Sequence, residues 1–378
     1  GTVSACGYIC PSCGSTKLSK PRQFNCMFKS QLGPVDPIHE LIEKHYDKNI
    51  PKQEFIEKLN AAVKKSAIYL RPETAQGIFV QFLNVLQTTS AKVPFGIAQI
   101  GKSFRNEIIV EHFIFRSCEF EQMEMEFFCE PGTQKEWMQY WMKERMNWYK
   151  KFVNSSEDLR LRKHETDELS HYSDETYDIE YNFPWGWDEL EGIASRTDYD
   201  LTQHAKASGA KLSYFDVNKK DPKTGKQGWR YVPYVIEPAA GLTRTFLSIL
   251  IDAYREDIQQ DAKGKEKTRV YLKLHPKLAP YKVAVLPLLK KDGHPEKAKE
   301  IAQELRKAGI RTVYDETSSI GKRYAKQDEI GTPWCLTVDQ ETLSEGKVTI
   351  RERDTTKQTK IVVEKIAEEI KNKLKISS

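Results

Sequence analysis

The feature that most constrains the fold is the stretch 95–128, FGIAQIGKSFRNEIIVEHFIFRSCEFEQMEMEFF, whose residues alternate at both ends. This pattern predicts two strands joined by a long loop. In each strand, residues two positions apart point to the same face, so each strand has one polar face. Its members are Gly101, Ser103, Arg105 and Glu107 in the first strand, and Phe120, Gln122, Glu124 and Glu126 in the second. The other face of the second strand, with Met123, Met125 and Phe127, should pack inward.

The polar face carries an arginine, an aromatic ring and several carboxylates. A guanidinium suits a phosphate, an aromatic ring suits a base, and carboxylates suit an ammonium group. Unpaired charge near a core is costly, which favours a binding site over a purely structural role. A surface hairpin with ion pairs between its strands is the alternative, and this stretch alone leaves both open.

Length and charge set broad limits. The chain has 378 residues, enough for two or three domains, and its net charge of +5 is compatible with a nucleic-acid partner without requiring one. No stretch has the length and apolar character of a membrane span, and no signal peptide opens the sequence, so we expect no membrane partner. Seven cysteines without a regular framework favour a reducing, cytoplasmic location.

The first 66 residues are polar and hold a cluster of cysteines. The CxxC pair Cys10 and Cys13 is half of a zinc-ribbon pattern, and Cys6 and Cys26 could complete a four-sulfur zinc site. Free thiols are the alternative. Residues 37–66 have the spacing of two short amphipathic helices, and we interpret 1–66 as an insertion.

The middle of the chain alternates between regular and polar segments. A short strand near 67 is followed by a helix, and Glu73 lies in the turn between them. A helix is expected over 133–153, a flexible loop over 154–175, and a strand at about 176–182. The acid-rich run from Asp188 to Asp200 could hold magnesium against phosphates or could be an exposed loop.

The remaining sequence predicts a second domain. Residues 231–257 indicate a strand, a turn at Pro238 and Gly241, and an apolar helix, with Glu237 and Arg244 close to the turn. Residues 258–280 are expected to form a charged linker. From Tyr281 onward, strands alternate with helices, the last over 357–374, which predicts a small covered sheet with right-handed crossovers.

Six motifs together resemble the homodimeric, class II glycyl-tRNA synthetases. They are LRPETAQGIFVQF (70–82), FGIAQIGKSFRNE (95–107), FEQMEMEFF (120–128), SRTDYDL (195–201), VIEPAAGLTR (235–244) and IGTPWCLTVD (330–339). The resemblance implies an α+β fold, an antiparallel sheet flanked by helices followed by an α/β anticodon-binding domain. The catalytic domain would span 1–275, with insertions at 1–66 and 130–175, and the anticodon-binding domain would span 281–378.

The resemblance also implies roles for individual residues. Those implied to bind ATP are Arg105, Asn106, Glu107, Phe115, Arg116, Phe120, Glu189, Leu190, Gly241 and Arg244. Those implied to bind glycine are Glu73, Gln122, Glu124, Arg196, Glu237 and Ala239. Arg105, Arg244 and the magnesium ligand Glu189 would assist the chemistry.

The implied partners are glycine, ATP with Mg²⁺, the tRNA for glycine and a second copy of the chain. Glycine and ATP would give glycyl-adenylate, and the tRNA terminal hydroxyl would then attack the adenylate carbonyl. Because glycine is the smallest amino acid, larger ones would be excluded by filling the pocket. In the C-terminal domain, Lys322, Arg323, Arg351 and Arg353 are candidate RNA contacts, with a solvated basic face as the alternative.

Some positions depart from the family pattern. Ala239, Thr243 and Cys118 stand where the family usually has serine, aspartate and arginine. The family's first motif, which builds the dimer, is not found, so we expect a segment missing at the front. A synthetase-like accessory protein that binds nucleic acid without catalysis is an alternative function. A synthetase for another amino acid is a third, which the pocket carboxylates argue against.

Overall fold

The structure, a computed structural model, describes residues 25–45, 50–260 and 266–376. The chain divides into two compact units, and each is described by itself. The first unit contains residues 1–76 and 100–122, and the second contains 77–99 and 123–378. Among the described residues, no helix combines the length and apolar character needed to span a bilayer.

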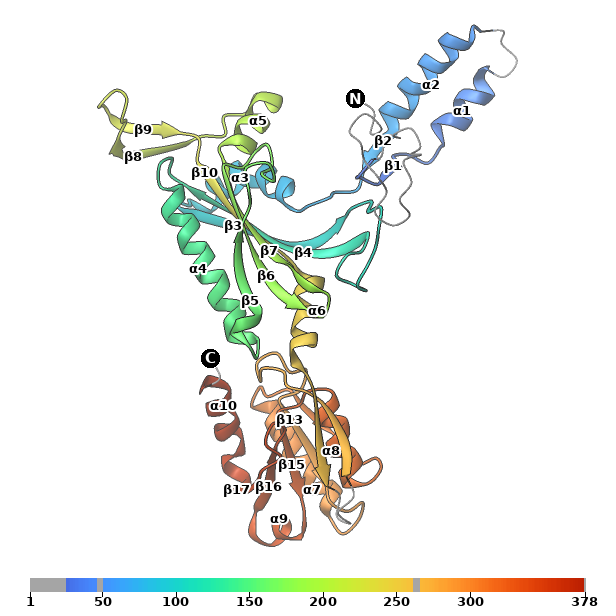
Figure 1. Ribbon diagram of the computed structural model, residues 1–378, viewed down its shortest axis with the longest axis vertical. Coiled ribbons are helices and arrows are strands. Elements are labelled where there is room, and N and C mark those ends of the chain that lie inside the picture. The colour runs from blue at the N-terminus through green and yellow to red at the C-terminus, as the bar shows by residue number, and fades with distance from the viewer. Residues whose placement is uncertain (1–24, 46–49, 261–265, 377–378) are drawn as a thin grey trace. The chain divides into compact units, whose positions relative to one another are not determined.

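The first unit begins with a small ribbon and a helical pair. Strands β1 (Lys29–Gln31) and β2 (Ala67–Tyr69) pair antiparallel, and helices α1 (Pro37–His45) and α2 (Lys52–Ser66) lie between them in the chain. The two amphipathic helices expected over 37–66 are confirmed. Neither helix, both drawn in blue in Figure 1, has a fully buried residue.

The two strands expected within 95–128 are also confirmed, as β3 (Phe95–Phe104) and β4 (Glu119–Cys129). Because β3 ends at Phe104, Arg105 and Glu107 lie in the following loop and not on the strand, contrary to the prediction. The expectation that the apolar face of β4 packs inward is confirmed for Phe127, which is buried, whereas Met123 and Met125 are half-buried. The sequence did not predict that Gln122, Glu124 and Glu126 on the other face would be buried as well.

A six-stranded sheet forms the core of the N-terminal part, in the order β3-β4-β10-β7-β6-β5. Its later strands are β5 (Leu159–Lys163), β6 (Glu175–Phe183), β7 (Gly186–Thr197) and β10 (Tyr234–Gly241), and their mutual pairings are antiparallel. The flexible loop expected over 154–175 is wrong at 159–163, where β5 adds an edge strand by pairing with β6. The turn expected at Pro238 is also wrong, because β10 continues through it and Pro238 pairs with Ile193.

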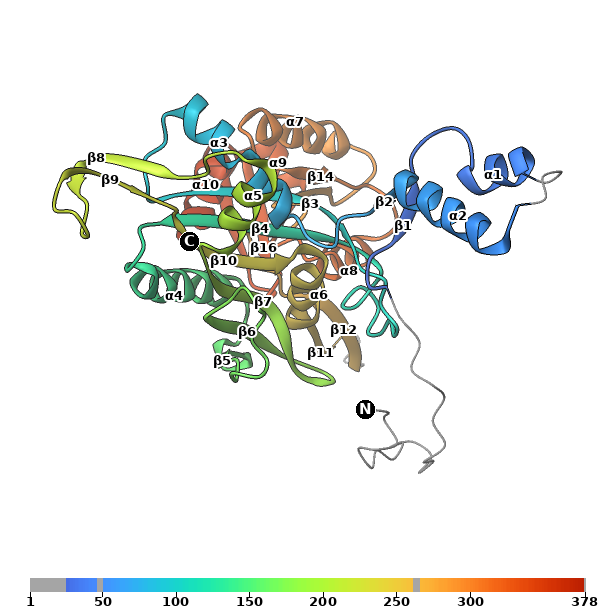
Figure 2. The ribbon, with the colours of Figure 1, turned by 90° about the horizontal axis from the view of Figure 1, so that it is seen from above.

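Helices follow from apolar residues at helical spacing. They are α3 (Ala75–Thr89), α4 (Gln134–Phe152), α5 (Tyr199–Ser208) and α6 (Leu242–Ala253). Helix α4 packs against β7 and β10, and Figure 2 shows it running along the sheet. The aromatic residues of α4 are packing residues, as expected: Trp137 and Trp141 lie with ring centroids 4.6 and 5.3 Å from that of Phe127 on β4.

Two antiparallel two-stranded ribbons flank β10 and α6 in the chain order. Strands β8 (Tyr214–Lys220) and β9 (Gln227–Tyr231) pair with each other, and so do β11 (Tyr254–Gln260) and β12 (Glu266–Leu272). The charged linker expected over 258–280 is therefore wrong at 258–260 and 266–272, which belong to these strands. Its charged residues alternate along paired strands, so the composition conceals a hairpin.

The C-terminal part is a five-stranded mixed sheet in the order β14-β13-β15-β16-β17. Its strands are β13 (Val283–Pro287), β14 (Thr312–Tyr314), β15 (Trp334–Val338), β16 (Lys347–Glu352) and β17 (Gln358–Val362). The first three are parallel, which confirms the expected alternation of strands and helices, and the last two add antiparallel. The helix expected over 357–374 is wrong at its start, because β17 occupies 358–362.

Helices cover both faces of this sheet. They are α7 (His294–Lys307), α8 (Ile320–Glu329), α9 (Gln340–Glu345) and α10 (Ile366–Ile376). Ile301 and Leu305 of α7 and Ile370 of α10 join one buried cluster with Val285. Residues of α8 pack on the other side, against Ala284, Leu286 and Cys335. Helix α7 ends at Lys307, and the φ of +82° at Gly309 lets the chain turn into β14.

Candidate active site

One group of predicted residues lies in the first unit, around the loop between β3 and β4. Arg105 is exposed, donates from Nε to the carbonyl of Pro72 at 3.1 Å, and lies 5.4 Å from the centroid of the Phe120 ring. Asn106 is fixed from both sides, because its backbone N–H donates to Cys26 and its side chain to Asn25. An exposed guanidinium next to an aromatic ring can bind a phosphate and stack on a base.

The loop itself contributes the other predicted residues of this unit. Glu111 and Arg116 form an isolated antiparallel bridge, and Arg116 is exposed with Nη1 3.6 Å from a Glu111 oxygen. Phe115 is buried, so it anchors the loop and cannot itself face an open ligand site. Gln122 is buried and its side-chain oxygen accepts a hydrogen bond from Ser103 at 3.0 Å. Glu73 is half-buried and its carboxylate accepts from Gln76.

A second group lies in the second unit and is built from buried carboxyls. Glu124 on β4 and Glu237 on β10, both predicted to bind glycine, are 4% and 7% exposed. Together with Glu126 they place one carboxyl oxygen each within 4.8 Å of one another. Three oxygens at this separation can surround an ammonium group, which has three hydrogen-bond donors.

Arg196 is the cation of this cluster. Its guanidinium donates from Nε and Nη2 to the two oxygens of Asp200 at 2.8 and 2.9 Å, and from Nη1 to Glu237 at 2.7 Å. It is 2% exposed and lies 3.9 Å from the Tyr172 ring centroid. Burial disfavours its charge, but Glu237 and Asp200 outweigh burial and raise the pKa of Arg196 above its ordinary value.

The backbone explains how Arg196 reaches this position. Along β10 and β7, Val235 pairs with Thr197, but the next residue, Ile236, pairs with Ser195, so Arg196 is an extra residue in a β-bulge. A bulge turns a side chain away from the regular alternation and is common beside functional sites. Ser195 and Arg196 are adjacent in sequence, yet Ser195 lines a polar cavity and Arg196 binds Asp200 and Glu237.

Glu126 stands out among the three carboxyls. It is fully buried, and neither of its oxygens has a hydrogen-bond partner among the described residues. Burial first, and then the charge of Glu237, raise the pKa of Glu126 well above its ordinary value, while Arg196 opposes this in part. An ionised carboxylate without donors would be costly in such a place.

Arg244 and Glu189 form a third arrangement, also in the second unit. Arg244 Nη1 donates to the Glu189 carbonyl at 2.9 Å and lies 3.2 Å from its carboxylate. The Glu189 side chain is 46% exposed, whereas its neighbour Leu190 is buried in the core. Gly241 precedes α6, and a Cβ there would lie 3.1 Å from Cβ of Arg244, so glycine keeps room for that arginine. A half-exposed carboxylate beside an arginine suits phosphates and their magnesium ion.

Positions that depart from the family pattern lie close to these groups in sequence and structure. Ala239 is half-buried on β10 and pairs with Gly192 of β7. Thr243 is half-buried at the start of α6, and the Cys118 carbonyl accepts from the backbone N–H of Arg105. The zinc prediction lies outside the described residues for Cys6, Cys10 and Cys13; Cys26 is described and exposed.

The prediction omitted two residues that complete the cluster of the second unit. Asp200 belongs to the acidic run 188–200, but its spacing did not predict that its two oxygens would form a bidentate pair with the Arg196 guanidinium. Glu126 shared the polar face with Glu124 and could have been included from alternation alone. Its full burial, which is what distinguishes it, depends on tertiary packing.

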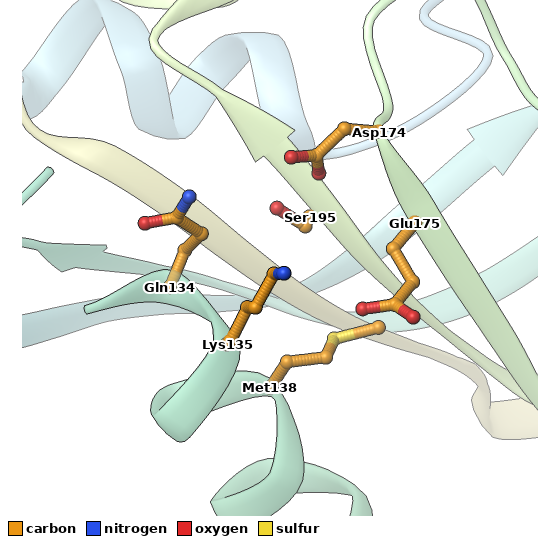
Figure 3. A pocket seen from close by; sticks show the side chains of 6 residues that line it. All are labelled: Gln134, Lys135, Met138, Asp174, Glu175 and Ser195. Atoms are coloured by element: carbon orange, nitrogen blue, oxygen red, sulfur yellow. The ribbon is translucent and has the colours of Figure 1, made fainter. Parts of the chain in front are cut away.

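The side of β7 that carries Ser195 lines a separate polar cavity of about 210 Å³. Figure 3 shows Ser195 between Asp174 and Lys135, with Met138 of α4 nearby. Ser195 is 2% exposed and its hydroxyl has no hydrogen-bond partner among the described residues. The cavity is polar and roomy enough to take water or a small polar molecule, which would satisfy that hydroxyl.

The arginines expected to contact RNA in the C-terminal part are mostly internal. Arg323, Arg351 and Arg353 are at most 6% exposed, so the expectation of a basic surface is wrong for them. Arg351 makes two hydrogen bonds with Asp328 at 2.8 and 2.9 Å. Arg323 and Arg353 donate to backbone carbonyls, and only Lys322 of the four is exposed.

A larger cavity of about 470 Å³ opens beside this network, lined by residues of β12, α8 and the end of β16. Arg269 lines it and is 8% exposed, yet its Nε has no hydrogen-bond partner among the described residues. The same guanidinium lies 4.0 Å from the Tyr271 ring centroid and donates to the carbonyl of Arg353. A buried guanidinium with an unused N–H can donate a hydrogen bond to an oxygen or ring nitrogen of a ligand.

Comparison with known proteins shows which family the chain belongs to. Residues 59–254 match the family model described as the tRNA synthetase class II core domain (G, H, P, S and T), and residues 282–373 match the model described as an anticodon binding domain. The glycine–tRNA ligase of Treponema denticola is 46% identical over 96% of this chain and 74% of its own length. Those of Mycolicibacterium paratuberculosis and Caldanaerobacter subterraneus subsp. tengcongensis are each 48% identical, over 94% and 97% of this chain and 70% of their own lengths.

Proposed function

The chain belongs to the glycine–tRNA ligases of class II, and on that premise we propose how its residues divide the binding of glycine, ATP and tRNA. The family confirms the predicted α+β fold and the predicted activity, the ATP-dependent ligation of glycine to its tRNA. The observation that supports the proposal most strongly is the buried acidic cluster of Glu124, Glu126 and Glu237 with Arg196 beside it.

In the proposal, Glu124 and Glu237 accept hydrogen bonds from the glycine ammonium group. Arg196 orients Glu237 through their 2.7 Å bond, and its remaining N–H groups are available to the glycine carboxylate, because three of its five donors are used within the protein. Glu73, Gln122 and Ala239 complete the predicted glycine contacts. Carboxyl groups crowded around the small substrate leave no space for a side chain on its Cα.

Nucleotide binding is assigned to the surroundings of exposed Arg105 and of half-buried Arg244. Arg105 would hold the α-phosphate and Phe120 would stack on adenine, while Asn106, Glu107, Phe115 and Arg116 shape the loop around them. Arg244 would approach the γ-phosphate, with Leu190 and Gly241 supporting its surroundings. Glu189 has the half-exposed carboxylate that a magnesium ion requires, and such an ion would neutralise charge on the phosphates.

The reaction then needs no side-chain nucleophile. The glycine carboxylate attacks the α-phosphorus of ATP, pyrophosphate leaves, and the tRNA terminal hydroxyl displaces AMP from the adenylate carbonyl. Arginines positioned on the phosphates stabilise the charge that develops during the first step, so positioning and electrostatics supply the catalysis.

Glycine-dependent pyrophosphate exchange tests these assignments. Glu124→Gln should raise the glycine KM about tenfold or more, since a charged hydrogen bond is lost, and leave the ATP KM unchanged. Glu189→Gln should instead raise the ATP KM and its magnesium requirement. Glu121→Gln, on the exposed side of the same strand β4, is the matched control and should change neither. A folded wild-type chain without any exchange would favour the accessory-protein alternative.

For tRNA, we propose that the anticodon end binds at the cavity beside Arg269. Arg269→Gln and Lys267→Gln should raise the tRNA KM in aminoacylation and leave pyrophosphate exchange unchanged, because activation of glycine does not involve tRNA. Lys371→Gln removes one charge from an exposed position on helix α10 and serves as the control. Equal effects of all three variants would mean that general charge, and not this cavity, binds the RNA.

The remaining family expectations are a homodimer and a cytoplasmic location. We extend both to this chain as proposals. Sedimentation velocity over a range of protein concentrations would detect the dimer, and a monomer at every concentration would contradict it.

A further inference from the structure

The carboxyl group of Glu126 has no role in the assignments above, although it lies in the middle of the acidic cluster. The groups that face it are Glu124 on its own strand, Glu237 on β10 and Arg196 on β7, with Asp200 of α5 behind that arginine. Only Arg196 is a cation. Its hydrogen bonds within the described part of the chain go to Asp200 and Glu237, so none reaches Glu126.

Two carboxylates this close cannot both remain ionised without a donor between them. Glu237 already has the guanidinium of Arg196, which favours its ionised form. Glu126 has neither a cation of its own nor an N–H donor, and both its oxygens are inaccessible to solvent. A proton on Glu126 resolves both problems at once, because a carboxylic acid can donate its O–H to the neighbouring carboxylate.

We propose that Glu126 is a positioning residue held as a neutral acid, which donates a hydrogen bond to Glu237 and thereby orients that carboxylate toward the glycine ammonium group. This inference rests on the proposed role of Glu237 in glycine binding. Glu237 then receives one donor from each side, Arg196 Nη1 and the Glu126 O–H, and keeps a lone pair for the substrate. The pocket carries two negative charges, from Glu124 and Glu237, where three would repel one another.

The proton can be detected without any substrate. At about pH 7, solvent-exposed carboxyls are ionised, so a carbonyl stretch of a protonated carboxyl in the infrared spectrum must come from a buried acid. We expect this band in the full wild-type chain and its loss in Glu126→Gln. Absence of the band in the wild type, or its persistence at full strength in a folded Glu126→Gln, overturns the proposal.

Kinetics test the positioning role. Glutamine keeps an N–H donor at this place without a charge, so the glycine KM of Glu126→Gln should stay within about threefold of wild type. Leucine has a similar volume and no donor, so Glu126→Leu should raise the glycine KM about tenfold or more and leave the ATP KM unchanged. If glutamine is as harmful as leucine, Glu126 acts by its charge or its shape, and the inference is wrong.

The two experiments also separate this inference from the proposed function. If the wild-type chain shows no glycine-dependent exchange, the assignment of the glycine site fails, but the infrared band still reports on the proton. If exchange proceeds normally and the band is absent, only the role of Glu126 is refuted. The wild-type spectrum needs no variant, so absence of the band overturns the inference even where Glu126→Gln or Glu126→Leu does not fold.

Discussion

Asp200 offers the sharpest test of how the buried arginine is held. Its two oxygens accept from Arg196 Nε and Nη2 at 2.8 and 2.9 Å, and the two residues are 5% and 2% exposed. Replacing Asp200 by alanine would leave the buried guanidinium of Arg196 hydrogen-bonded to Glu237 alone among the described carboxylates. Removing one partner of a buried ion pair costs about 3–5 kcal/mol, because the other charge is left uncompensated.

Asp200→Asn should be milder. The asparagine oxygen can still accept one N–H, but its amide nitrogen faces the second, so one charged hydrogen bond is lost at a cost of about 1.5–3 kcal/mol. Asp198→Asn is the control: it lies two residues earlier, is half-exposed, and precedes helix α5, where aspartate and asparagine cap equally well. We expect it to change stability by less than about 0.5 kcal/mol.

Urea unfolding followed by tryptophan fluorescence is the assay. All tryptophans except Trp334 lie before residue 254, so the signal reports mainly on the part that contains Asp200. Asp200→Ala and Asp200→Asn should also lower glycine-dependent exchange, because Arg196 loses its fixed orientation. If Asp200→Asn and Asp198→Asn unfold at the same urea concentration with the same slope, the bidentate pair does not stabilise this site and the reasoning is refuted.

Three further predictions concern titration, thiol reactivity and packing. The pKa of Glu126 is raised above its value of about 4.5 in the unfolded chain. The neutral carboxyl therefore stabilises the fold below that pH, and this stabilisation is lost as pH rises toward the folded pKa, by up to about 1.4 kcal/mol per pH unit. Glu126→Gln should gain stability relative to wild type between about pH 5 and 8 in urea titrations, and a constant difference would contradict this. Burial raises the pKa of Cys129 and of Cys335 to about 12, so at about pH 8 iodoacetamide should label exposed Cys26 before either, as read by peptide mass spectrometry. Gly331→Ala should destabilise the C-terminal part by about 1–3 kcal/mol, because φ is +80° and a Cβ would lie 2.7 Å from Leu274, whereas Gly346→Ala, with nothing within 4 Å, should cost only the backbone strain of about 1 kcal/mol in thermal unfolding.

Long helices were predictable from the sequence because the apolar residues on their buried face recur at helical spacing. Helices α4 and α7 were predicted for this reason, and strand β13 was predicted from a continuous apolar run, which is typical of a strand buried on both faces. The pairing of β11 with β12 was not predicted, since residues such as Lys267 and Arg269 gave the segment the composition of a linker. The sequence predicted a helix where strand β17 lies, because this short strand is followed almost directly by the helical spacing of α10.

Burial of charge was the property least visible in the sequence. Arg351 looked like an RNA contact, but its partner Asp328 lies 23 residues away and only the fold brings them together. The bulge at Arg196 depends on the pairing of two strands separated by about forty residues, which no local spacing reveals. Family motifs nevertheless selected Glu124, Arg196 and Glu237, because residue type at a motif position carries functional information that periodicity does not.

The arrangement of Arg196 links the two ends of the proposed substrate. One nitrogen donates to Glu237, assigned to the ammonium group, and the same guanidinium has donors left for the carboxylate. The N–H that donates to Glu237 and the unused N–H groups are therefore separated by little more than the width of the guanidinium. This separation suits an amino acid, whose ammonium and carboxylate groups are joined through a single carbon. An enlarged substrate would have to displace Glu124 or Glu237, and a displaced Glu237 would leave Arg196 short of a partner. Selection against larger amino acids is then coupled to the energy of the buried ion pair, and weakening that pair through Asp200 should relax selectivity as well as stability.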